Sequence, residues 1–225
     1  MPQTLLAGLA TTSHDQGTSA SATYTSVAVA SGLFPAPGQV CPTGYSCADI
    51  GAVTPAGGQT VPNTNWTVTA GGPDIWGTAD AFHYIWAPLP ANGAISTQVA
   101  SITATDPWAR AGAMVRATTS PGSPFYAIYV SKGNGVVVQE RTAQGATAIQ
   151  IANTTGTAPE YVEVTRTGTV YAAATSTNGT TWTTVPGSTL TLANLSGSLL
   201  RGLAITSHSS GNPGSASFDT VTTSP

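Results

Sequence analysis

The chain carries two copies of one sequence segment, one near each end. Residues 5–27 read LLAGLATTSHDQGTSASATYTSV and residues 199–221 read LLRGLAITSHSSGNPGSASFDTV, with 12 of 23 positions identical at a constant offset of 194 residues. An ungapped repeat at a fixed offset is typical of a tandem array of similar modules. We therefore interpret residues 1–30 as the C-terminal strands of a preceding repeat, or as donated strands. Residues 31–64 then form a Pro/Gly-rich linker and N-terminal segment, and residues 65–225 form one complete sandwich.

Composition and turn signals predict an all-β fold. Only 7% of the residues are charged, and small and β-branched residues dominate without a helical pattern. Short alternating segments are separated by turn signals, among them the hairpin-favouring pair Asn178-Gly179. The predicted strands cover residues 5–10, 21–29, 65–68, 82–86, 95–102, 111–117, 126–130, 136–141, 161–166, 170–176, 199–206 and 215–222. This spacing predicts two antiparallel sheets packed as a sandwich.

Charge and hydropathy exclude two classes of partner. The net charge is −3 and the chain has only six Lys and Arg residues, which are scattered. A nucleic-acid site or an anionic membrane surface would require a basic patch, so neither is expected as a partner. No stretch reaches the roughly 18 apolar residues that span a bilayer, so membrane insertion is not expected either. Residues 1–3 lack the pattern of a signal peptide, so we expect Met1 to mark the start of a fragment.

The two cysteines indicate an oxidising compartment. Cys41 and Cys47 enclose a short loop that contains Gly44, and this arrangement favours a local disulfide. A zinc site would require two more ligands, and no Cys or His lies near them in sequence. With few lysines and many Thr and Ser residues, the chain is expected to be an exported bacterial protein, located outside the cell or at the cell surface.

Three segments carry a resemblance to a known family. They are DIWGTADAFHY at residues 74–84, TDPWARAGAMVR at residues 105–116 and GNG at residues 133–135. The chain from about residue 41 onward resembles a concanavalin-A-like jelly-roll family of unknown function from secreted bacterial proteins. It is also similar to the β-sandwich modules that follow the catalytic domain in some family 43 glycosidases. The resemblance implies a two-sheet antiparallel jelly roll of the concanavalin-A/LamG-like class, and a glycan-binding or accessory role.

Catalysis is not expected. Glucanases with this fold use two carboxylates about 5–10 Å apart. The chain has three glutamates, Glu140, Glu160 and Glu163, and none of them belongs to the Glu-x-Asp-x-x-Glu arrangement of those glucanases. The equivalent histidines His14 and His208 each end a Thr-Ser-His segment, where an imidazole bonded to loop backbone is the simpler interpretation.

Glycan binding requires aromatic faces for sugar rings and planar polar groups for hydroxyls. Trp76 and Trp108 lie in turn-like segments, where a large ring is harder to explain as core. Period-two alternation places Arg110 with Arg116 on one strand face, and Gln139 with Arg141 on another. The predicted ligand-binding residues are Trp76, Trp108, Arg110, Arg116, Tyr126, Tyr129, Gln139, Arg141 and His83.

Each of these assignments has a structural alternative. The arginines could instead form ion pairs with Asp74, Asp80, Asp106 or Glu140, and His83 could be a hydrogen-bonded structural residue. Trp66, Trp86 and Trp182 are expected to pack in the core or across a hairpin. A structural calcium site at Asp74, Asp80 and Asp219 is a further hypothesis, with no other cofactor expected.

Two functions remain open from the sequence. The first is a non-catalytic carbohydrate-binding or accessory module of an exported multi-repeat protein. The second is a building block of an extracellular filament, stalk or adhesin. In that case the apolar strands predicted within residues 5–29 would pair with the edge of a module, or with a neighbouring copy, and would mediate self-association.

Overall fold

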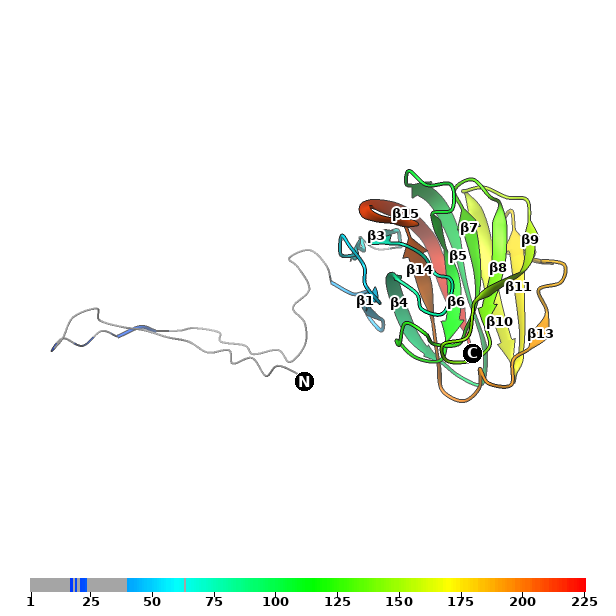
Figure 1. The fold of residues 1–225 in the computed structure, drawn as a ribbon, viewed down its shortest axis with the longest axis horizontal. Coiled ribbons are helices and arrows are strands. Elements are labelled where there is room, and N and C mark those ends of the chain that lie inside the picture. The colour runs from blue at the N-terminus through cyan, green and yellow to red at the C-terminus, as the bar shows by residue number, and fades with distance from the viewer. Residues whose placement is uncertain (1–16, 18, 20, 24–39, 63) are drawn as a thin grey trace. The chain divides into compact units, whose positions relative to one another are not determined.

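The computed structural model describes residues 17, 19, 21–23, 40–62 and 64–225, and the chain divides into two units, residues 1–36 and residues 37–225. The described part of the second unit contains only strands and loops. Two antiparallel sheets make up the unit, in agreement with the predicted sandwich (Figure 1). The predicted boundary near residue 31, the strand predicted at residues 5–10 and residues 24–29 of the strand predicted at residues 21–29 lie outside the described residues, while residues 21–23 are described and are not in a strand.

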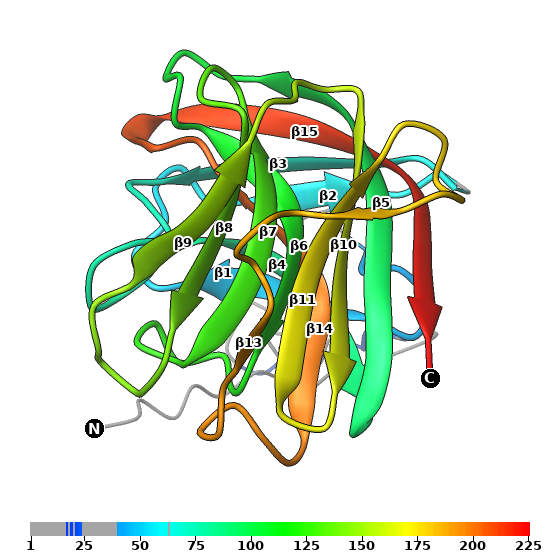
Figure 2. The same ribbon diagram turned by 90° about the vertical axis from the view of Figure 1, so that its right-hand side faces the viewer.

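The first sheet has seven strands and the second has eight. The order in the first is β1 (Ser46–Ile50), β4 (Phe82–Leu89), β14 (Leu199–Thr206), β6 (Arg110–Arg116), β7 (Phe125–Ser131), β8 (Val136–Arg141) and β9 (Ile149–Thr154). The order in the second is β12 (Thr183–Thr184), β11 (Val170–Ser176), β10 (Glu160–Thr167), β5 (Asn92–Thr103), β15 (Ser209–Ser224), β3 (Trp66–Gly72) and β2 (Gly58–Thr60), with β13 (Leu190–Thr191) paired to β11. Figure 2 shows β9, β8, β7 and β6 side by side, and β11, β10 and β5 beside one another.

The main hydrophobic core lies between the two sheets. Alternate residues of β3 and β5, such as Val68 and Ile95, meet alternate residues of β6 and β7, such as Val115 and Ile128. Trp66 is buried in this core with its ring edge-on to Tyr45, as the sequence predicts for a core tryptophan. β3 and β5 show the period-two burial of half-buried antiparallel strands, whereas β6 and β7 are buried on both faces.

β14 and β15 follow each other in the sequence, and each holds an interior position in a different sheet. β14 lies between β4 and β6, and β15 lies between β3 and β5. Figure 2 shows β15 bending along its length, and register shifts at residues 217–218 and 219–222 accompany the bend. Residues 199–221, which are repeated near the N-terminus, are therefore strands that hold both sheets together.

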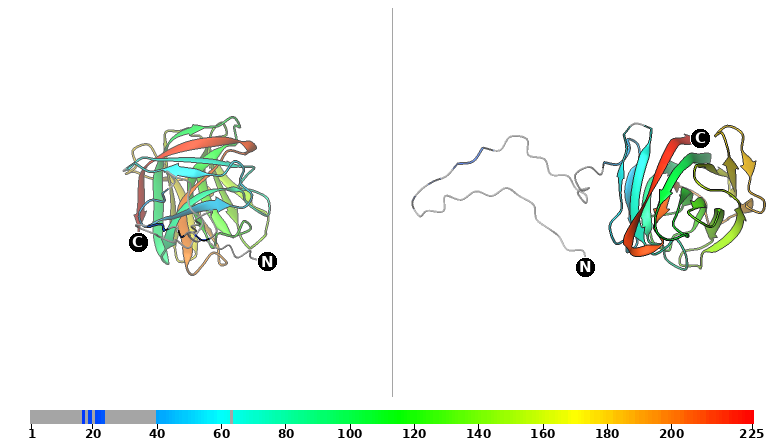
Figure 3. Two further views of the ribbon diagram at one scale, coloured as in Figure 1. Left: turned by 90° about the vertical axis from the view of Figure 1, so that its left-hand side faces the viewer. Right: turned by 90° about the horizontal axis from the view of Figure 1, so that it is seen from above.

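The sandwich begins earlier than residue 65. β1 pairs with β4 and β2 pairs with β3, so both strands belong to the sheets (Figure 3). Their Pro/Gly-rich surroundings made residues 31–64 resemble a linker. The predicted disulfide is confirmed between Cys41 and Cys47, whose Cα atoms are 5.8 Å apart. It joins Cys47, the second residue of β1, to Cys41 in the segment before the strand.

Candidate functional site

The outer face of the seven-stranded sheet is the face that points away from the other sheet. It carries a second hydrophobic cluster, which includes Tyr84 of β4, Met114 of β6 and Tyr129 of β7. The predicted alternation is confirmed here, because Arg110 and Arg116 of β6 share this face with Met114. Gln139 and Arg141 of β8 share it with Val137 of the cluster. Two loops, which contribute Ile75 and Ala148, cover part of this face.

One end of the outer face is closed by a buried ion triad. Asp80 accepts hydrogen bonds from Arg141 at 2.6 and 2.7 Å and from Arg116 at 3.1 Å. All three side chains are fully inaccessible to solvent. The other N–H groups of the two arginines donate to loop carbonyls, including those of Thr118, Ser120 and Ala146.

The prediction that Arg116 and Arg141 bind ligand is therefore wrong. They do not lie on neighbouring strands, because β7 separates β6 from β8. They meet instead through Asp80, which the loop before β4 places between them. The alternative of a structural ion-pair network is confirmed at this position, since unpaired charges could not be buried so completely.

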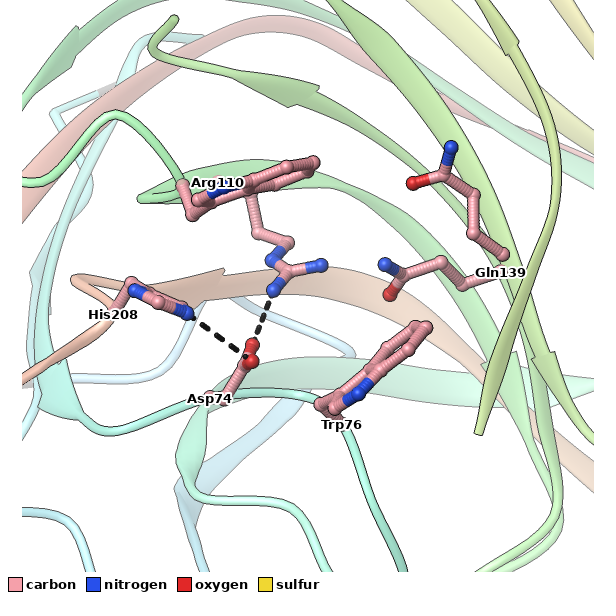
Figure 4. Close-up of a pocket in the computed structure, with 7 residues that line it drawn as sticks. Asp74, Trp76, Arg110, Gln139 and His208 are labelled. Carbon is pink, nitrogen blue, oxygen red and sulfur yellow. Dashed lines mark hydrogen bonds and ion pairs between the residues drawn. The ribbon is translucent and has the colours of Figure 1, made fainter. Parts of the chain in front are cut away.

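The other end of the outer face contains a cavity of about 370 Å³. Trp76 and Trp108 are 39% and 37% exposed and line it from two different loops. Figure 4 shows Arg110 at the centre, with Asp74 and His208 on one side and Gln139 on the other. The lining residues are Asp74, Trp76, Trp108, Arg110, Gln139, Gln150 and His208.

Arg110 is 2% exposed, yet most of its guanidinium is not hydrogen-bonded. One terminal nitrogen, Nη2, donates to Asp74, while Nε and Nη1 have no partner. The guanidinium carbon lies 5.9 Å from the ring centres of both Trp108 and Tyr129, which holds the group between two aromatic faces. A buried guanidinium with open donors is costly unless something else satisfies it.

Further unpaired polar atoms surround Arg110. Gln139 is 1% exposed and its carbonyl oxygen has no partner, and the hydroxyl of Tyr129 is also buried without one. Burial raises the pKa of the Tyr129 phenol well above its usual range, so the hydroxyl remains a neutral donor. Gln150 of β9 adds a second amide to the cavity wall. Several donors and acceptors thus converge on one small space.

His208 fixes the position of two acidic residues at the cavity. Its Nε2 lies 3.3 Å from Asp74, and its Nδ1 lies 3.1 Å from Asp106 in an orientation that makes no hydrogen bond. The backbone of His208 has φ of 55°, in the left-handed region that costs a residue with a side chain about 1–2 kcal/mol. The hydroxyl of Thr206 accepts from the His208 amide and donates to Gly72, which stabilises this turn. Strained residues of this kind often lie at functional sites.

Asp106 orients Trp108. Its carboxylate accepts a 2.7 Å hydrogen bond from the Trp108 amide, which holds the loop in an Asx turn. This hydrogen bond is the main cause of a lowered pKa of Asp106; desolvation opposes it, and His208 and Arg110 lower the pKa further by smaller amounts. The ion-pair network of Asp74, Arg110, His208 and Asp106 therefore supports one wall of the cavity.

Two further predicted ligand residues face away from the cavity. Tyr126 points into the core between the sheets, where its hydroxyl donates to the Ser188 carbonyl at 2.7 Å. Phe125, the preceding residue of β7, points to the outer face instead, and the sequence alone did not show which of the two faces Tyr126 occupies. His83 is bonded by Asp49 at 2.7 Å and Gln59 at 2.8 Å, so the structural alternative for this residue is confirmed.

The predicted calcium ligands do not come together. Asp74 pairs with Arg110 and His208, Asp80 belongs to the buried triad, and Asp219 lies on β15 in the other sheet beside Asn65. No cluster of three or more metal-ligating side chains is present among the residues that the structure describes. Spacing along the chain did not show that arginines would pair with two of these carboxylates.

The sequence analysis missed two cavity residues. Gln150 lies on β9, a strand whose polar sequence had not been recognised, and His208 was interpreted as purely structural. Retention of the Thr-Ser-His segment in both copies of the repeat was the available signal for His208. In contrast, Trp76, Trp108, Arg110 and Gln139 of the predicted set line one cavity, and Tyr129 lies directly beside Arg110.

Among the described residues, the structure contains no helix long and apolar enough to cross a membrane.

Comparison with known proteins establishes the fold. No protein-family model matches the chain, and no curated protein is significantly similar in sequence. Among solved structures, a functionally unknown protein from Saccharomyces cerevisiae matches 81% of this chain and 96% of its own, with 16% identity and a TM-score of 0.59. A family 43 glycoside hydrolase from Bacillus licheniformis matches 79% of this chain with 13% identity and a TM-score of 0.56.

A xylan β-1,4-xylosidase from Bacillus halodurans C-125 matches 68% of this chain with 12% identity and a TM-score of 0.51. The match spans only 38% of the Bacillus licheniformis chain and 32% of the xylosidase. At these identities the likeness concerns the fold alone. The chain is therefore an all-β, two-sheet antiparallel sandwich whose architecture also occurs as part of larger glycoside hydrolases.

Proposed function

We propose that this chain is a non-catalytic carbohydrate-binding module that takes a sugar residue into the cavity between Trp76 and Trp108. The observation that carries the proposal is the pairing of these two half-exposed indoles with a buried, incompletely bonded Arg110 and Gln139. Indole faces stack on the apolar faces of sugar rings, and amide and guanidinium groups bond hydroxyls. The volume of about 370 Å³ lies at the lower end of the range for ligand pockets.

The charged groups of the cavity support binding rather than hydrolysis. A glycosidase requires two carboxyl groups on opposite sides of the scissile bond. Asp74 is the one carboxylate among the described lining residues, and both of its oxygens are engaged by Arg110 and His208. Glu140 lies on the opposite face of β8 from Gln139, so its carboxyl group does not reach the cavity.

The setting that we propose for the module is extracellular. The disulfide between Cys41 and Cys47 would form and persist in an oxidising environment. A binding module of this kind, attached to a carbohydrate-active enzyme or a surface protein, would hold its parent protein against a polysaccharide.

The test is glycan-array and polysaccharide pull-down binding with the full 225-residue chain and two variants, Trp76→Ala and Trp108→Ala. We expect either substitution to weaken binding at least tenfold, because a stacked sugar loses one aromatic face. Trp182→Ala serves as a matched control, since Trp182 is part-exposed and does not line the cavity. Binding by the native chain that survives both cavity substitutions would disprove the site, and no binding by a folded native chain would disprove the function.

A second candidate function is a building block of an extracellular filament, stalk or adhesin. The repeat supports it, because β14 and β15 are interior strands and residues 5–27 copy their sequence. Residues 5–27 keep residues that β14 and β15 require for their packing. Gly202 is one example, since a Cβ there would lie 2.1 Å from the Ile85 carbonyl oxygen, and its counterpart is Gly8. In this proposal residues 5–29 complete a module in a neighbouring chain by strand pairing.

Light scattering tests this second function. We expect the native chain to associate and a Leu9→Asp variant to remain monomeric, because Leu9 corresponds to the buried core residue Leu203. A native chain that is monomeric at all concentrations would argue against strand exchange and would leave the glycan-binding proposal unaffected.

A further inference from the structure

We infer that the sugar bound in the cavity carries a carboxylate, and that Arg110 is the residue that recognises it. This inference rests on the proposed function and names the chemical class of the ligand. It depends on a difference in hydrogen bonding between Arg110 and the two other arginines of the same sheet face, Arg116 and Arg141.

In the two structural arginines of this face, all three guanidinium nitrogens donate hydrogen bonds within the protein. Arg116 uses Nε, Nη1 and Nη2 as donors, to Thr118, Asp80 and Ser120 respectively. In Arg141 the same three nitrogens donate to Ala146, Asp80 and neighbouring loop carbonyls. Arg110 is buried to nearly the same extent, but only Nη2 has a partner.

One of the open donors of Arg110 points into the cavity, on the side away from its carboxylate partner. Figure 4 shows one nitrogen of the guanidinium directed at Asp74 and another directed toward Gln139. Asp74 is also contacted from its other side by His208, so Arg110 is not the only partner of this carboxylate. An acceptor placed between Arg110 and Gln139 would therefore meet a cationic donor that Asp74 only partly neutralises.

A carboxylate suits this position better than a hydroxyl. Hydrogen bonds between a guanidinium and a carboxylate are charge-assisted and about twice as strong as neutral ones. Burial between the rings of Trp108 and Tyr129 lowers the local dielectric and strengthens them further.

The experiment compares acidic sugars with their neutral counterparts on the native protein. Oligogalacturonate, oligomannuronate, oligoguluronate and glucuronate-substituted xylan fragments are each printed beside the same oligosaccharide after reduction of its carboxyl groups. We expect at least one acidic member to bind tenfold or more tightly than its reduced counterpart, with a preference that falls as salt rises from 50 to 500 mM. Since only the ligand changes, no outcome depends on whether a variant folds.

Two variants then assign the preference to a residue. Arg110→Gln should bring the ratio between acidic and reduced ligand close to one, whereas Trp76→Ala should weaken both ligands and leave the ratio unchanged. Thermal unfolding checks that each variant is folded. Equal binding of acidic and reduced ligands by the native chain would overturn this inference and leave the proposed function standing. No binding of any glycan would overturn both, and a preference that persists in folded Arg110→Gln would overturn the assignment to Arg110.

Discussion

The two ends of the outer sheet face contain the same kinds of residue in different states of bonding. At one end, Arg116 and Arg141 share the fully buried carboxylate of Asp80, and loop carbonyls take their remaining donors. At the other end, Arg110 pairs with the part-exposed Asp74 and keeps two nitrogens unpaired beside a cavity. Burial of an arginine is thus no guide to its role. The number of its donors that the protein itself satisfies distinguishes the structural arginines from Arg110, to which we assign ligand recognition.

The largest effect is expected from disrupting the buried ion triad of Asp80, Arg116 and Arg141, which forms the closed end of the outer face. Asp80→Asn would leave two fully buried guanidinium groups without a negative partner. Removal of one member of a buried ion pair typically costs about 3–5 kcal/mol. We expect a loss of unfolding free energy in that range, measured by urea denaturation followed by tryptophan fluorescence. A loss below about 1 kcal/mol would show that the loop carbonyls alone satisfy the arginines.

The matched change at the open end should cost much less. Asp74→Asn removes a carboxylate whose side chain is part-exposed, and the amide oxygen can still accept from Arg110. We expect a loss of about 1 kcal/mol or less, as for ion pairs in contact with solvent. The same urea denaturation series measures it, and a cost equal to that of Asp80→Asn would remove the distinction between the two ends.

Two tyrosines on β7 provide a smaller test of the same difference. Tyr126 donates to the Ser188 carbonyl in the core, whereas the Tyr129 hydroxyl beside Arg110 has no partner. We expect Tyr126→Phe to lower the unfolding free energy by about 1 kcal/mol and Tyr129→Phe to leave it unchanged or slightly raised. Thermal unfolding of both variants in one buffer measures this, and an equal loss in both would mean that Tyr129 has a partner in solution.

The sequence predicted the framework of the fold better than the details of the site. Alternating residues and turn signals identified the strands that became β3 to β8, β10, β11, β14 and β15, because these strands are long and are separated by clear turn signals. Strands β1, β2, β9, β12 and β13 were not predicted, since they are short or polar and take their structure from the strands beside them. Local pattern carries no information about such pairing.

The site shows the same limit. Period two placed Arg110, Arg116, Gln139 and Arg141 on the correct face, because strand geometry alone decides the face. It could not show that Asp80, from a loop at distant sequence positions, would occupy Arg116 and Arg141 while Asp74 would leave Arg110 partly open. Which arginine remains available depends on loop contacts that only the three-dimensional structure reveals.

The smallest predicted effect concerns Glu140, a buried carboxyl group that has no arginine partner. It lies between Gln139 and Arg141 on β8 but points to the opposite face, and one of its oxygens is unpaired. Desolvation raises its pKa above the ordinary value of 4.5. The folded state then binds this proton more tightly than the unfolded state, so Glu140 lowers stability as the pH rises through the interval between the two pKa values.

Glu140→Gln should therefore stabilise the protein above that interval and have little effect below it. We expect a gain of roughly 0.5 kcal/mol at pH 8 that disappears toward pH 4, since the amide keeps the shape of the side chain without its charge. Urea denaturation of the native chain and the variant at several pH values between 4 and 8 measures this difference. A variant that is less stable than the native chain at pH 8 would mean that the ionised carboxylate of Glu140 has a favourable partner on the inner side of β8.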